Sequence, residues 1–178
     1  MGLIIDLRNQ HLVVKVVLAI FHGGNDMFRE IVGFRQDELG DWVAELSCLH
    51  AQYVRHRPPF QIRPWVLDDD ERNSRVGTLL SCSLCDRCQL PEGVVLDSVV
   101  GPWNRSTLPK GLLSAHKVPA GTWGVLKVKR GSVQFDIQVA PPMHLQLSEG
   151  DSQAIPPEIL HNVNPGSDAE LEIEFWTR

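Results

Sequence analysis

The distribution of cysteine most constrains what this chain can fold into. The four cysteines lie at positions 48, 82, 85 and 88, and none occurs in the C-terminal half. A disulfide framework usually spreads over a small secreted domain, whereas cysteines clustered with histidine are typical of metal binding. The spacings Cys48-x-His50 and Cys82-x-x-Cys85 therefore predict two pairs of ligands for one metal ion.

Zinc is the ion that this pattern favours. It binds four soft or borderline ligands in a tetrahedron, often as two pairs from separate segments, and four protein ligands leave no open position for chemistry. We therefore expect a structural zinc site. Three alternatives stay open: His56 in place of His50, an iron–sulfur cluster that also uses Cys88, and free thiols or a redox pair.

Composition and charge limit the class of protein. The chain has 178 residues, 43% of them apolar, which suits one globular domain or two small ones. Its net charge of −5 argues against a general nucleic-acid binder. The apolar run at 11–21 has the length of a signal-peptide core, but Lys15 interrupts it and it is too short to span a bilayer. We interpret residues 1–26 as an appendage, with Met27 as an alternative start, and expect a cytoplasmic protein without a membrane partner.

Short β-branched runs separated by glycine and proline predict a mainly β fold. Two strands and a hairpin are expected between 29 and 47, and a short helix after Asp68, whereas the prolines in 55–64 exclude a central strand there. The character changes around 89–104, and short strands between 123 and 176 predict an antiparallel sandwich or barrel. We expect an appendage (1–26), a small zinc-binding α+β module (27–90) and a β-barrel domain (91–178).

A basic, aromatic segment follows the first ligand pair. Arg55, Arg57 and Arg63 could contact an anion or a nucleic-acid backbone, with nearby rings stacking on bases. The alternative is that these arginines pair with neighbouring acidic residues. Because the chain is acidic and has no second basic cluster, nucleic acid is the weaker expectation.

The N-terminal half also resembles a known family. The stretch IVGFRQDELGDWVAELSCLHAQYVRHRPPFQIRPWV, followed by LSCSLCDR, is similar over residues 30–87 to a small bacterial domain family of unknown function. The resemblance implies that the family's Cys-x-His and Cys-x-x-Cys elements are the four expected zinc ligands. Cys88 is not a family cysteine, which weakens the iron–sulfur alternative. Leu49 stands where the family usually has glycine.

The C-terminal half resembles a cupin, on the stretches GLLSAHKVPAGTWGVLKVKRGSVQF and LSEGDSQAIPPEILHNVNP. More narrowly, it is similar to the tellurite-resistance-related family of YeaR-like and TehB-like proteins. The resemblance implies a double-stranded β-helix barrel, with histidines and a carboxylate at its mouth in the metal-binding members. This chain departs from the pattern, because Gly124 stands in place of the usual glutamate and Glu158 in place of a glycine.

The resemblance carries His116 and His161 over as ligands of a divalent transition metal. Glu174 is the candidate third ligand, with an outward, solvated side chain as the alternative. Trp123 is expected to line a ligand site with the two histidines. These residues lead to the hypothesis that the barrel binds or turns over a small anion or metabolite at a metal. The alternative is a non-enzymatic ligand sensor or adaptor that contacts protein or nucleic acid through the zinc module, and a homodimer stays open.

Overall fold

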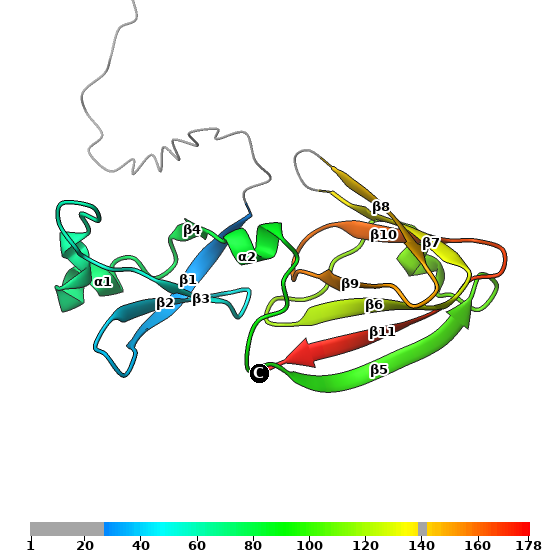
Figure 1. Ribbon diagram of the computed structural model, residues 1–178, viewed down its shortest axis with the longest axis horizontal. Helices are drawn as coiled ribbons and strands as arrows, with labels where there is room; N and C mark the ends of the chain where they lie inside the picture. The colour runs from blue at the N-terminus through cyan, green and yellow to red at the C-terminus, as the bar shows by residue number, and fades with distance from the viewer. Residues whose placement is uncertain (1–26, 139–141) are drawn as a thin grey trace, which may run out of the picture.

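The structure is a computed structural model that describes residues 27–138 and 142–178, so the expected appendage at 1–26 lies outside the described residues. The fold is mainly β, as the sequence predicts, and consists of two β units that follow one another along the chain (Figure 1). Among the described residues, no helix is long and apolar enough to cross a membrane.

The N-terminal unit is a four-stranded antiparallel sheet in the order β3-β2-β1-β4. The hairpin between β1 and β2 is closed by Asp37, whose Oδ1 accepts hydrogen bonds from the backbone N–H groups of Leu39 and Asp41. Gly40 supplies the positive φ of 80° that the turn requires. The strands are β1 (Phe28–Gln36), β2 (Trp42–Leu46), β3 (Ala51–Tyr53) and β4 (Leu79–Ser81).

Three short helical segments complete this unit: η1 (Pro64–Val66), α1 (Asp69–Asn73) and α2 (Ser83–Asp86). The expected helix after Asp68 is present as α1, and the Asp68 side chain caps it by accepting a hydrogen bond from Glu71 N at 2.9 Å. The segment 55–64 forms no strand of the sheet, as its prolines predict.

The C-terminal unit has two antiparallel sheets that face each other across one apolar core. One sheet has the order β10-β7-β8 and the other β5-β11-β6-β9, and Figure 1 shows them as two layers. Inward side chains of both sheets, among them Leu126, Phe135 and Leu171, are fully buried in this core. The elements are β5 (Val95–Asn104), η2 (Lys110–Leu113), β6 (Trp123–Arg130), β7 (Ser132–Ile137), β8 (Met143–Ser148), β9 (Ser152–Ile155), β10 (His161–Pro165) and β11 (Glu170–Thr177).

Two non-glycine residues at positions where the family resemblances imply glycine both have left-handed backbone conformations. Leu49 has φ of 69° and Glu158 has φ of 63°. An L-residue in this region costs about 1–2 kcal/mol because its Cβ crowds the following carbonyl. The usual glycine at these positions therefore has a physical reason, and this chain accepts strain at both.

Replacing Glu158 by glycine should stabilise the protein. The strain relieved exceeds the extra chain entropy that glycine brings to the unfolded state, so the free energy of unfolding should rise by up to about 1 kcal/mol. Urea denaturation of Glu158→Gly and Glu158→Ala measures the effect. Because alanine keeps the Cβ, Glu158→Ala should show no gain, and equal stabilities of the two variants would contradict this explanation.

Candidate metal centre

Four ligating side chains meet in the N-terminal unit, and they come from two segments. Cys48 and His50 lie in the turn between β2 and β3, whereas Cys82 and Cys85 lie at the start and inside α2. All four are buried, and their ligating atoms lie within 4.8 Å of one another. Among the described residues this is the one group of three or more such side chains that could hold a metal ion.

The distances within the group match a tetrahedron around one ion. His50 Nδ1 lies 3.5 Å from Cys48 Sγ, 3.4 Å from Cys82 Sγ and 3.6 Å from Cys85 Sγ, and the Cys48 and Cys82 sulfurs are 3.9 Å apart. Bonds of ~2.3 Å to sulfur and ~2.0 Å to nitrogen give tetrahedral edges of about 3.8 Å between sulfurs and about 3.5 Å from sulfur to nitrogen. None of the four cysteines forms a disulfide, which would bring two sulfurs to ~2.05 Å.

The ring of His50 is held in the tautomer that a metal ligand needs. Its Nε2 lies 2.9 Å from the carbonyl oxygen of Gln89, so Nε2–H donates to that carbonyl and Nδ1 keeps its lone pair toward the sulfurs. Burial alone lowers the pKa of His50, but hydrogen bonds to the Cys48 and Cys82 sulfurs outweigh it and raise the pKa to about 9. The neighbouring sulfurs therefore favour the protonated form of this imidazole.

The thiols of the group differ in acidity. Contacts with Cys48 first, and then with Cys85, lower the pKa of the Cys82 thiol, whereas contacts with Cys48 and Cys82 raise the pKa of Cys85. Of these two thiols, Cys82 is therefore the more acidic. A bound cation would remove the remaining protons, because the thiolate is the form that ligates.

Arg29 supplies a positive charge beside the group. It is only 4% exposed, and its Nε lies 3.4 Å from Cys85 Sγ. Three thiolates, a neutral imidazole and a divalent cation carry a net charge of −1, which the guanidinium of Arg29 balances. Buried charges need such a partner, since an unpaired charge is costly in a low-dielectric interior. Arg29 was not predicted as part of the site, because no local spacing links it to the cysteines.

The two alternative ligands lie elsewhere. Cys88 does not belong to the group: its side chain packs with the core of the C-terminal unit, and burial raises the pKa of its thiol to about 11. His56 uses its Nδ1 to accept a hydrogen bond from the backbone N–H of Arg63 at 2.9 Å. The geometry thus selects the set predicted first from the spacings.

Trp123 lies against this group and does not line a ligand site in the barrel, so that expectation is wrong. Its indole Nε1–H donates to the carbonyl oxygen of Cys48 at 2.8 Å, and its ring meets His50 edge to face at 5.3 Å between centroids. On β6 the inward positions belong to Gly124 and Leu126, which leaves Trp123 on the outer face of the sheet. It is fully buried there, beside the partly buried Trp176 of β11 and residues of the N-terminal unit.

The metal group is therefore attached to the barrel from two sides. Besides the indole of Trp123, Arg29 reaches across, and its Nη1 donates to the carbonyl oxygen of Pro157 at 2.9 Å. Pro157 lies in the segment 156–160 that leads into β10 and His161. Both units contribute side chains to one buried cluster. The ordered arrangement of the four ligands and the packing of the N-terminal unit on the barrel therefore depend on each other.

The structure brings His116 and His161 together. Their backbones form an isolated antiparallel bridge, and their ring centroids are 4.2 Å apart. Each ring is fixed by a carbonyl two residues earlier, since Nδ1 of His116 lies 2.9 Å from Ser114 O and Nδ1 of His161 lies 2.8 Å from Ile159 O. Burial, with a smaller contribution from His116, lowers the pKa of His161 to about 4, so this ring is neutral at neutral pH.

Glu174 does not join these histidines, and its expected role as third ligand is wrong. Along β11, Leu171 and Ile173 face the barrel core, which places Glu174 on the outer face of the sheet. There it pairs with Lys127 and accepts a hydrogen bond from Trp176 Nε1 at 3.1 Å. The outward alternative was therefore right about direction, although Glu174 is buried rather than solvated.

Two arginines of the basic segment pair with the same carboxylate. Arg55 Nε lies 2.7 Å from Asp41, and Arg57 binds the same carboxylate at 2.9 Å. The guanidinium of Arg55 also stacks 4.0 Å from the ring centroid of Tyr53. Their shared acidic partner is Asp41 of the hairpin, which was not predicted from the sequence, and the expected anion or nucleic-acid contacts stay a prediction.

Two family models match separate parts of the chain. Residues 32–89 match a family described as a protein of unknown function (DUF3565), and residues 100–173 match the TehB-like domain. Both resemblances inferred from the sequence are thereby confirmed. The segment that matches DUF3565 contains all four cysteines, and the segment that matches the TehB-like domain lies in the C-terminal β unit.

Solved structures similar to part of the chain belong to several bacteria. They include a protein from E. coli strain K12, with 24% identity over 50% of this chain and 95% of that chain and a TM-score of 0.46. TehB from Haemophilus influenzae has 20% identity over 49% of this chain and 32% of that chain, with a TM-score of 0.43. A cupin protein from Bacteroides fragilis has 15% identity over 36% of this chain and 52% of that chain, with a TM-score of 0.29. No curated protein is a significant match.

Proposed function

We propose that the chain is a zinc-stabilised cupin that binds a small anion or metabolite at a second metal, held by His116 and His161. The paired imidazoles carry this proposal. Because each Nδ1–H is engaged by a backbone carbonyl, both Nε2 lone pairs are left for a ligand or an ion. Two protein ligands leave most of the coordination sphere to water or to an anion, and tellurite belongs to this class of anion.

In this proposal the Cys48–His50–Cys82–Cys85 group holds zinc, and its role is structural. Its edges suit the bond lengths of zinc to thiolate and imidazole, and four protein ligands fill the tetrahedron. No coordination position is left for a substrate. The zinc would order the N-terminal unit and, through Trp123 and Arg29, seat it on the barrel. Free thiols in such a site suit a reducing compartment, and we propose a cytoplasmic location.

Cobalt titration of the zinc-depleted full chain distinguishes the two sites. Co²⁺ in a site with three thiolates gives intense charge-transfer absorption, whereas Co²⁺ on two imidazoles and water gives only weak visible bands. We expect two equivalents to bind, and added azide, as the probe anion, should shift only the weak bands.

Matched variants show which histidines bind the second equivalent of Co²⁺. His116→Gln should abolish the weak bands and the azide response while the charge-transfer absorption stays. His144→Gln, which alters an exposed histidine paired with Asp136, should leave both signals unchanged. A wild-type chain that binds a single equivalent, or a second equivalent that survives His116→Gln, would refute the proposed anion site.

One observation favours the alternative role, that of an adaptor that contacts a partner through the zinc module. Phe60 and Ile62, which lie within the basic segment between Arg57 and Arg63, are 93% and 73% exposed, which suits contact with a protein more than with nucleic acid. If the chain binds one metal only, this alternative replaces the anion site.

A further inference from the structure

The outer face of the three-stranded sheet is a grid of amide and hydroxyl side chains. The β-sheet register places Asn164, Gln134 and Gln146 in one row across β10, β7 and β8. The next row along the strands holds Asn162, Asp136 and His144. The intervening side chains on β7, such as Phe135, point into the core. We call the four amides Gln134, Gln146, Asn162 and Asn164 the amide face.

This face differs from the outer face of the other sheet. There, lysines of β6 pair with glutamates of β11, for example Lys129 with Glu172 at 2.9 Å. Within β7, β8 and β10, Asp136 is the sole aspartate, glutamate, lysine or arginine. Solvated sheet faces are usually rich in charged residues, so a neutral polar face of this size calls for an explanation.

Asp136 organises one end of the face. It accepts hydrogen bonds from Asn162 Nδ2 at 3.2 Å and from Gln134 Nε2 at 3.4 Å, and His144 Nδ1 lies 2.6 Å from it. The hydrogen bond from His144, followed by those from the two amides, lowers the pKa of Asp136. The carboxylate is thus ionised at neutral pH, and it orients the amides so that their carbonyl oxygens stay free to accept hydrogen bonds.

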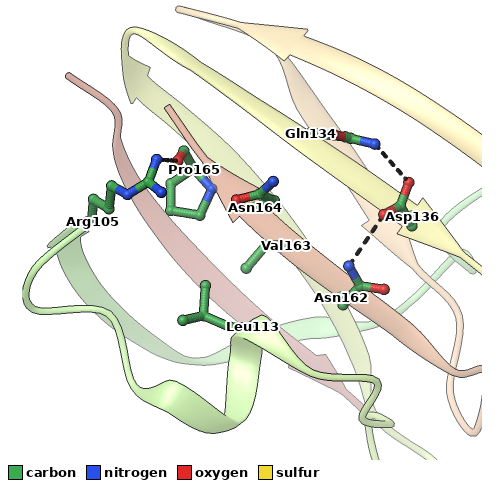
Figure 2. Close-up of a pocket in the computed structure, with 8 residues that line it drawn as sticks. All are labelled: Arg105, Leu113, Gln134, Asp136, Asn162, Val163, Asn164 and Pro165. Atoms are coloured by element: carbon green, nitrogen blue, oxygen red, sulfur yellow. Dashed lines mark hydrogen bonds between the residues drawn. The ribbon is translucent and has the colours of Figure 1, made fainter. Parts of the chain in front are cut away.

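A hollow of about 390 Å³ lies over these residues and is bounded at its other end by Arg105. Figure 2 shows the side chains of Arg105 and Asp136 at opposite ends of the set, with Asn164 and Val163 between them. One guanidinium nitrogen of Arg105 donates to Pro165 O at 3.1 Å, which leaves its other N–H groups available. A second hollow, of about 230 Å³, continues over Gln134, Gln146 and Asn164 and is also lined by Arg105.

We propose that this hollow binds a small polyhydroxylated carboxylate, the chemistry of a sugar acid. The guanidinium of Arg105 suits a carboxylate, which it can bind with two parallel hydrogen bonds. Amides both donate to and accept from neighbouring hydroxyl groups, and Asp136 accepts from a hydroxyl at the far end. Leu113, which is 47% exposed, supplies an apolar contact for the carbon skeleton. The site is separate from the His116–His161 pair and needs no metal.

Titration of the zinc-loaded full chain with sodium D-glucuronate, followed by the side-chain amide signals in nitrogen–proton NMR spectra, tests this site. We expect saturable shifts of the asparagine and glutamine NH₂ signals of the amide face. D-glucose, which lacks the carboxylate, should bind about tenfold or more weakly, because a charge-assisted pair is lost. Acetate, which lacks the hydroxyls, should produce no saturable shifts of these signals.

Two variants show whether the named residues are responsible. Arg105→Gln should weaken glucuronate binding to the level of glucose while leaving glucose unchanged, and Asn164→Ala should weaken both sugars. Arg35→Gln, an exposed arginine on β1, is the matched control and should change neither. Glucuronate binding that is absent at tens of millimolar, or that survives Arg105→Gln, overturns the proposal. Because the readout does not involve a metal, its failure is distinguishable from failure of the proposed anion site.

Discussion

Removing the metal from the intact chain should unfold the N-terminal unit and leave the barrel folded. The four ligands lie on segments that otherwise share a small core, and zinc-linked folding free energy in such modules is on the order of 10 kcal/mol. After chelation we expect near-ultraviolet circular dichroism to lose the signals of Trp42 and Trp65, while far-ultraviolet dichroism of the β-barrel persists. Adding zinc back should restore the near-ultraviolet signals of the two tryptophans.

A pair of cysteine variants makes the same test without a chelator. Cys85→Ser removes a ligand and should reproduce the metal-free state, because three ligands hold the ion far less tightly. Cys88→Ser alters the buried cysteine outside the group and should keep one bound metal. If chelation leaves all signals unchanged, or if Cys88→Ser loses metal as Cys85→Ser does, the assigned ligand set is wrong.

Arg29→Met should be the most damaging substitution that leaves all four ligands in place. It removes the guanidinium beside Cys85 and leaves both the negative metal site and the carbonyl of Pro157 without their partner. Breaking one side of a buried charge pair costs about 3–5 kcal/mol. We expect a loss of that order in the unfolding free energy of the N-terminal unit, together with faster release of zinc to a chelator.

Two companion variants separate charge from packing. Arg29→Lys keeps the positive charge and should recover part of the zinc retention. Arg35→Met, on the same strand, breaks only an exposed pair with Glu45 and should change stability by less than about 0.5 kcal/mol. Equal zinc release from Arg29→Met and Arg35→Met would show that the guanidinium does not balance the charge of the site.

Local sequence patterns correctly predicted the features that are formed by residues close together in the chain. The ligand pairs follow from short spacings, and the hairpin with Gly40 and the helix capped by Asp68 follow from turn and capping chemistry. β5 was not expected as a strand, because its residues are mostly exposed on both faces and show no alternation. It is an edge strand, held by pairing with β11 rather than by burial.

The wrong assignments concern which face of a strand a side chain takes. Trp123 and Glu174 were both expected inside the barrel, and both lie on its outer face. Reversing the face of a strand takes only a one-residue difference in register, and an outer face covered by another unit is as apolar as a core. Arg29 was missed because its partners, Cys85 and Pro157, are far from it in sequence.

X-ray absorption at the zinc edge of the purified, intact chain tests the central claim most directly. The account predicts one zinc per chain in the N-terminal site, with three sulfur neighbours at ~2.3 Å and one nitrogen neighbour at ~2.0 Å. This shell corresponds to Cys48, Cys82, Cys85 and His50. A shell of four sulfurs, a shell of oxygen and nitrogen alone, or a chain purified with no zinc at this site would contradict it.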